Sequence, residues 1–218
     1  MLSQYIALAT IAASSVYALP NIANRDNTGV WDPNGNIKLT FSHDTVKLGD
    51  VDINAMFDAL TGACHESGQC DTSPLTFDGW WQASGLNGEM GPIVVTMDPS
   101  GAYPTWIRNG LVDTLRAAVL AAANCGNSVN TQGCGGDEKG CQLTKTTAWQ
   151  CEIPKYVGIN FQDPKAANAA PPNIGADITM ELVDSDICAQ ILGGMGAVAG
   201  AVSGYAGGIF SLLSLACN

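Results

Sequence analysis

Residues 93–123 read IVVTMDPSGAYPTWIRNGLVDTLRAAVLAAA, and this stretch decides the fold. Its first five residues, Ile93–Met97, are rich in β-branched side chains and predict a strand. The Asp98-Pro99-Ser100-Gly101 segment predicts a break after that strand. Pro104 suits the first turn of a helix, which we expect to run to about Ala123. The sequence therefore predicts a strand followed by a helix.

An apolar stripe marks the face of this helix that we expect to be buried. Arg108 and Arg116 lie off the stripe, which leaves it free to pack on a sheet containing Ile93 and Val95. The stripe residues recur at helical spacing, namely Ile107, Leu111, Leu115, Ala118, Ala122 and Cys125.

Further strands and one further helix surround this unit. Residues 36–42 alternate apolar and polar side chains, which predicts a half-buried strand. A helix follows, with Asp50 or Asp52 as its cap and an end near Gly62. Residues 27–36 are turn-rich, and residues 125–141 read as a disulfide-held loop. Other strands are predicted at 75–83, 144–153, 156–161 and 176–183. This order predicts an α+β fold, an α/β sandwich with helices packed on one face of an antiparallel sheet.

The last part of the chain is uncharged. Residues 189–216 carry no charged side chain, and glycines recur every fourth residue inside them. We expect an apolar helix over 187–217, whose glycine stripe allows a second helix to approach closely. Such a helix can be buried in its own domain or inserted in a membrane, and an oligomer can form through the stripe. The stripe consists of Gly196, Gly200, Gly204 and Gly208.

The N-terminus and the cysteines indicate the secretory pathway. Residues 1–18 resemble a signal peptide, 19–25 a possible pro-segment ending at Arg25, and 26–218 a single domain. The cysteines are even in number and form no C-x-x-C pair, so we expect four disulfides, with Cys64–Cys70 as the first pair. The eight cysteines are Cys64, Cys70, Cys125, Cys134, Cys141, Cys151, Cys188 and Cys217.

Composition excludes one class of partner. The formal net charge is −11, and only 13% of the residues are charged. Because a phosphate polyanion is repelled by an acidic chain, the sequence predicts no binding to nucleic acid.

Chemistry-bearing residues are few. Each histidine has an acidic neighbour, in His43-Asp44 and His65-Glu66, yet no nucleophile elbow or metal-protease motif is present. The carboxylate pairs Asp50 with Asp52 and Asp184 with Asp186 can serve glycoside hydrolysis, but we favour helix capping. We therefore expect no catalytic residue, metal or cofactor.

Two adjacent tryptophans are the candidate ligand contacts. In a strand Trp80 and Trp81 point to opposite faces, so one of them can be exposed and contact a ligand. Ordinary packing at a sheet edge is the alternative explanation.

The signal peptide, the acidic chain, the strand–helix order of residues 93–123 and the hydrophobic helix together resemble the fungal killer toxins. That family includes the salt-mediated and smut-fungus toxins and effectors of the same fold. The resemblance covers residues 36–217, carries no specific motif, and lacks a dibasic processing site. It implies a secreted toxin or effector that acts on the membrane or surface of competing or host cells. A secreted module that binds a cell-wall glycan or host protein, and a hydrolase with an unrecognised site, are the alternatives.

Overall fold

A computed structural model describes residues 28–31, 35–133, 142–162, 170–180, 182–183, 201 and 212–217. The predicted signal peptide, the pro-segment, Asp184 with Asp186, and the four glycines of the stripe lie outside these residues. Among the helices in the described part, none is long and apolar enough to cross a bilayer.

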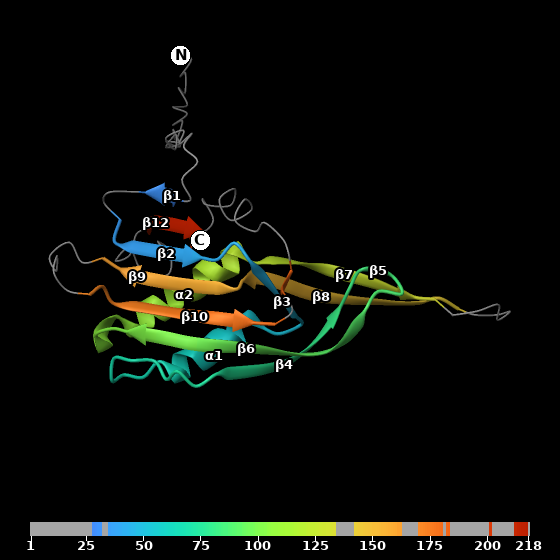
Figure 1. The fold of residues 1–218 in the computed structure, drawn as a ribbon, viewed down its shortest axis with the longest axis horizontal. Helices are drawn as coiled ribbons and strands as arrows, with labels where there is room; N and C mark the ends of the chain where they lie inside the picture. The colour runs from blue at the N-terminus through green and yellow to red at the C-terminus, as the bar shows by residue number, and fades with distance from the viewer. Residues whose placement is uncertain are drawn as a thin grey trace, which may run out of the picture.

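Two β-sheets and two α-helices make up the described part, a mixed α+β fold as predicted (Figure 1). All neighbouring strands are antiparallel except the pairs β12–β2 and β5–β7. In sheet order, the larger sheet has β1 (Thr28–Trp31), β12 (Leu212–Cys217), β2 (Ile37–Phe41), β9 (Tyr156–Phe161), β10 (Asn173–Thr179), β6 (Met90–Ala102) and β4 (Leu75–Gln82). The smaller has β11 (Leu182–Val183), β3 (Thr45–Gly49), β8 (Thr144–Pro154), β7 (Asn124–Gln132) and β5 (Gly85–Leu86).

The core lies between the larger sheet and the two helices, α1 (Ile53–Ala63) and α2 (Arg108–Ala122). A short 3-10 turn, η1 (Thr105–Ile107), precedes α2. Both helices lie behind the larger sheet in the view of Figure 1. Alternate strand residues face them, as period-two burial requires. The fully buried core residues include Ile37, Leu39, Phe41, Phe57, Val95, Met97, Leu111, Leu115, Ala118, Val157, Ile159, Ala176 and Ile178. Of the predicted stripe, Ile107, Leu111, Leu115 and Ala118 are therefore confirmed as core, whereas Ala122 is only partly buried and Cys125 belongs to β7.

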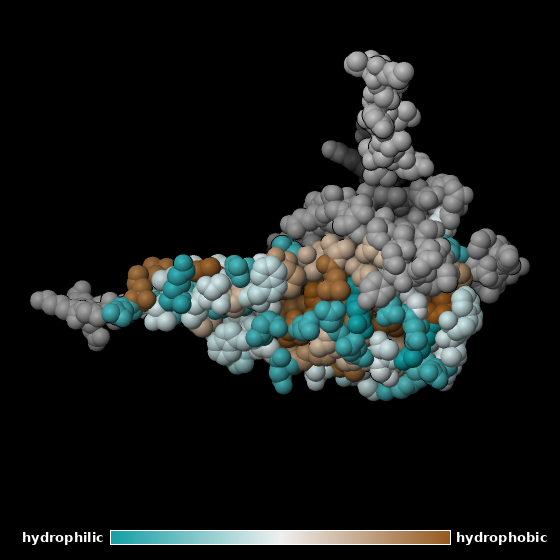
Figure 2. Space-filling model, turned by 180° about the vertical axis from the view of Figure 1, so that it is seen from behind, coloured by the Kyte–Doolittle hydropathy of each residue, from teal (hydrophilic) through white to brown (hydrophobic). Residues whose placement is uncertain are grey.

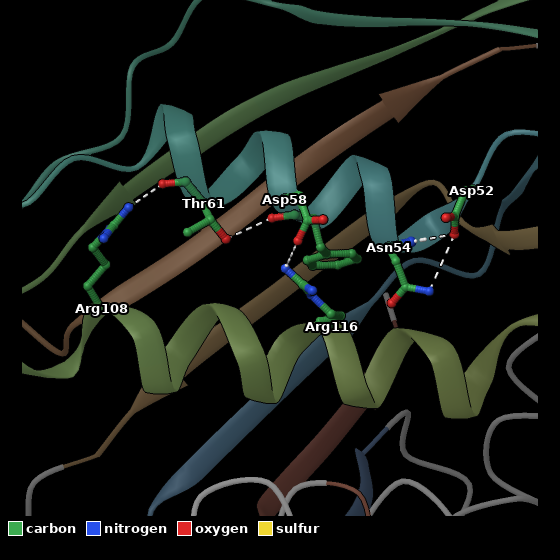
Figure 3. A network of polar contacts seen from close by, with 7 residues as sticks. Asp52, Asn54, Asp58, Thr61, Arg108 and Arg116 are labelled. Carbon is green, nitrogen blue, oxygen red and sulfur yellow. Dashed lines mark hydrogen bonds and ion pairs between the residues drawn. The ribbon is translucent and has the colours of Figure 1, made fainter.

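Polar contacts join the ends and sides of the helices (Figure 3). Asp52 caps α1, because its Oδ1 accepts a hydrogen bond from the Asn54 backbone N at 2.9 Å. Arg116 of α2 forms an ion pair with Asp58 of α1 at 2.6 Å. Arg108 donates to the carbonyl oxygens of Thr61 and Cys64, which satisfies acceptors at the end of α1.

The predicted break at Asp98–Gly101 is wrong, because β6 continues through it to Ala102. Pairing with β4 ends at the Leu75–Met97 pair, whereas pairing with β10 continues to Asn173 opposite Ala102. Pro99 therefore lies where β6 has a strand neighbour on one side only, and such a position tolerates a residue without an N–H.

The C-terminal helix is also wrong for its last residues, since Leu212–Cys217 form strand β12. This strand lies between β1 and β2, antiparallel to the first and parallel to the second. It covers the edge of β2 and so satisfies the backbone groups of a strand whose alternate side chains are fully buried. Strand β1 likewise replaces part of the turn-rich segment expected over residues 27–36.

Candidate binding cleft

A long hairpin projects from the molecule and is here called the arm. The arm consists of this hairpin, strands β7 and β8, together with the turn at residues 83–89 that connects β4 to β6 and packs on β7, and it extends to the right in Figure 1. Its two strands pair in continuous register from Asn124 opposite Glu152 to Gln132 opposite Thr144. The disulfide-held loop predicted over residues 125–141 is therefore corrected to a strand as far as Gln132.

Disulfides close two positions in the described part. Cys64 bonds to Cys70, as predicted, and Cys125 bonds to Cys151 directly across the base of the arm. Cys134, Cys141 and Cys188 lie outside the described residues, and Cys217 is described only as a member of β12. The prediction of four disulfides is thus confirmed for two.

The larger sheet and the two helices are here called the body. Gln82, at the end of β4, joins the body to the arm through hydrogen bonds. Its side chain is only 3% exposed, and its Nε2 donates to the carbonyl oxygen of Ser128 at 2.8 Å. Its Oε1 accepts from the Thr146 hydroxyl at 3.1 Å. The side-chain amide of Gln150, oriented to match, donates to the backbone carbonyl of Gln82 at 3.0 Å and accepts from its backbone N–H at 2.8 Å. Both the side-chain amide and the backbone N–H and C=O of Gln82 thereby have hydrogen-bond partners.

The turn at residues 83–89 is fastened to β7 by two asparagines. Asn130 is fully buried, and its Nδ2 donates to the carbonyl oxygens of Ala83 and Gly88 at 2.9 and 2.8 Å. Asn87 has a positive φ of 53°, and its Oδ1 accepts from the Gly133 N–H at 2.6 Å. Asparagine suits this position, because its short polar side chain tolerates a left-handed backbone.

Between β4 and the base of the arm lies a cleft of about 420 Å³. Amide and hydroxyl groups predominate on its walls, together with one ammonium, one carboxylate and one indole. The lining residues are Lys47, Trp81, Gln82, Ala83, Ser84, Asn124, Gly126, Asn127, Ser128, Gln150, Cys151 and Glu152. The cleft therefore has a largely neutral polar lining beside a single aromatic wall.

Trp81 forms that wall, and its partner is Lys47, whose Nζ lies 4.4 Å from the ring centroid. This is the geometry of a cation–π interaction, which holds the ammonium at the wall. Lys47 of β3 is also the register partner of Glu152 of β8, so the two opposite charges of the cleft face each other across neighbouring strands.

The structure separates the two candidate tryptophans. Trp81 lines the cleft, whereas Trp80 is 41% exposed on the other face of β4. Its backbone N donates to Asp50 Oδ1 at 2.6 Å. Asp50 therefore fastens the loop after β3 to the edge of β4, and Asp52 caps α1. Both carboxylates have structural roles.

The histidines do not join the cleft. His43 lies between β2 and β3, and exposed His65 lies in the Cys64–Cys70 loop. Within the described ranges no three metal-binding side chains come together.

Lys47, Gln82 and Gln150 were missed from the sequence. A signal was available only for their neighbours in β7, where the period-two polar pattern at Asn124, Ser128, Asn130 and Gln132 marks one face of a polar strand.

Exposed apolar side chains lie farther out on the arm. Leu86 and Leu143 are 69% and 65% exposed, and Figure 2 shows apolar surface near the outer end of the arm. Trp149 is 60% exposed on the face of the hairpin turned away from Gln150.

Comparison with known protein families, curated proteins and solved structures gives no match.

Proposed function

We propose that this chain is a secreted binding module that holds a saccharide in the cleft beside Trp81. Export is supported by the signal-like N-terminus and by the two disulfides. A cell-wall glycan is the ligand class that matches the walls of the cleft. The observation that carries the proposal is the pairing of one indole wall with a dense set of amides and hydroxyls.

A sugar has the chemistry that this arrangement complements. Its hydroxyl groups both donate and accept hydrogen bonds, as does the side-chain amide of Asn124, while the Lys47 ammonium can donate and the Glu152 carboxylate can accept. Its ring C–H groups can pack against the indole of Trp81. An apolar ligand would instead leave these polar groups dehydrated and unpaired.

Calorimetric titration of the mature protein with neutral oligosaccharides tests the proposal. Trp81→Ala removes the aromatic wall and should weaken binding by about tenfold or more. Trp149→Ala is the matched control, because it removes an exposed indole from the opposite face of the same hairpin. Binding lost equally in both variants, or binding of no oligosaccharide by the wild type, would contradict the proposal.

A membrane-active toxin of killer-toxin type is the second candidate, and the uncharged run supports it. With β12 removed, residues 189–211 still form an uncharged stretch long enough to cross a hydrocarbon layer as a helix. Dye release from liposomes tests this function. Gly200→Leu and Gly204→Leu should abolish release, whereas Ala201→Leu should preserve it. Vesicles that stay sealed with the wild type would exclude it.

A further inference from the structure

At the base of the arm, the edge of β7 that faces away from β8 has backbone groups with which no described strand pairs. Strand β5 pairs with β7 only at Asn130 and Thr131. Beyond these residues, no described strand pairs with β7 on this side at Cys125 or Asn127. The base of the arm therefore presents an open strand edge to the cleft.

Two contacts show which backbone groups face this edge. The Val129 N–H donates to Ser84 Oγ at 3.3 Å, and the Thr131 carbonyl accepts from the Asn87 N–H at 2.7 Å. Because backbone groups alternate between the two sides of a strand, Asn127 and Cys125 direct their N–H and C=O groups to the same side.

The disulfide at the base agrees with this assignment. The Cα atoms of Cys125 and Cys151 are 4.1 Å apart, the short spacing typical of an antiparallel pair that is not joined by its own hydrogen bonds. The N–H and C=O of Cys125 therefore point away from β8, to the same side as those of Asn127, which is a lining residue of the cleft.

We propose that the cleft selects 2-acetamido sugars by pairing their acetamido group with this open edge; the inference rests on the saccharide-binding function proposed above. An acetamido group is a secondary amide with one N–H and one C=O, the same groups that a neighbouring strand would supply. The N–H of Asn127 meets the acetamido carbonyl, and a carbonyl of the edge accepts from the acetamido N–H. A plain glucose unit has a hydroxyl at this position, without the matched amide geometry.

An extended peptide is the rival occupant of a strand edge. The open edge is short, because α2 ends just before Asn124 and Ser84 already occupies the N–H of Val129. Three residues, Cys125 to Asn127, span about 10 Å of strand, which leaves room for few ladder hydrogen bonds. A single sugar unit with its acetamido group needs no longer edge.

Calorimetric titration of the wild type with two matched ligands tests the proposal. The β-1,4-linked tetramer of N-acetylglucosamine should bind about tenfold more tightly than the β-1,4-linked tetramer of glucose. Equal affinity for the two would overturn the acetamido selection and leave the saccharide function standing. Binding of neither would overturn both. Displacement of the N-acetylated tetramer by an extended peptide, with no preference between the sugars, would assign the edge to peptides.

A pair of variants isolates the backbone donor. Asn127→Pro deletes the N–H that faces the cleft and removes no ladder bond to β8, since proline is tolerated where the N–H points away from a partner. Asn127→Ala keeps that N–H and removes only the side chain. We expect Asn127→Pro to lose the preference for the N-acetylated tetramer and Asn127→Ala to keep it, with thermal unfolding as the check on folding. An unchanged preference in a folded Asn127→Pro protein would contradict the proposal, and the wild-type comparison decides if that variant does not fold.

Discussion

Ile37, Leu39 and Phe41 in the body of the molecule are fully buried among other apolar side chains, whereas in the arm beyond its basal disulfide the one fully buried residue of the described part is Asn130, an amide. The body is stabilised by apolar area removed from water, at roughly 25 cal/mol per Å². The arm is held by hydrogen bonds, each contributing about 0.5–1.5 kcal/mol net. The difference shows that one chain can build a stable support and a polar binding surface by separate means.

The largest expected effect lies in the body. Leu115 is fully buried in α2, so Leu115→Ala should lower the free energy of unfolding by about 2–5 kcal/mol through lost transfer energy and a cavity. Urea unfolding measures this change. A decrease below about 0.5 kcal/mol would mean that this face of α2 is not part of the core.

An intermediate effect is expected where arm and body meet. Gln82→Leu keeps the side-chain volume but removes the amide donor and the amide acceptor. The free energy of unfolding should fall by about 1–3 kcal/mol, because the buried partners of the amide lose their hydrogen bonds. Hydrogen exchange should show faster opening of β7 while β2 and β9 keep their protection. Thr147→Ala, on the exposed face of β8, is the control and should change stability by less than about 0.5 kcal/mol. Equally faster exchange in β2, β9 and β7 would mean that the arm and the body are not stabilised separately.

The smallest expected effect concerns the turn. Asn87→Ala places a residue with a Cβ at a φ of 53° and removes the bond to Gly133, for a cost of about 1–2 kcal/mol. Asn87→Gly removes the same bond but relieves the backbone strain, so it should cost about 1 kcal/mol or less. Thermal unfolding compares the two variants. A glycine variant less stable than the alanine variant would contradict this account of the turn.

The body could be predicted from the sequence because its strands and helices carry apolar side chains at periods of two and 3.6. Ile37, Leu39 and Phe41 mark β2, and the stripe through Leu115 marks α2. The arm could not be predicted in this way. Strand β7 contains a single aliphatic residue, Val129, and its stability comes from hydrogen bonds to residues distant in the chain.

The C-terminal residues show a second limit of prediction from local sequence patterns. An uncharged run suits a helix, yet its last residues, Leu212–Cys217, form β12 because the edge of β2 is available to them. At the cleft, the sequence singled out Trp80 and Trp81 but could not say which one lines it. That answer depends on how Lys47 and the base of the arm pack around β4.

Amide hydrogen exchange at Asn127, with and without the N-acetylglucosamine tetramer, tests the central claim most directly. The account predicts fast exchange in the free protein, since no described strand pairs with this N–H, and marked slowing when the tetramer is bound. The Val129 N–H, which already donates to Ser84 Oγ, should change little and serves as the internal reference. Protection of Asn127 that is already complete in the free protein, or that is unchanged by saturating tetramer, would contradict the account.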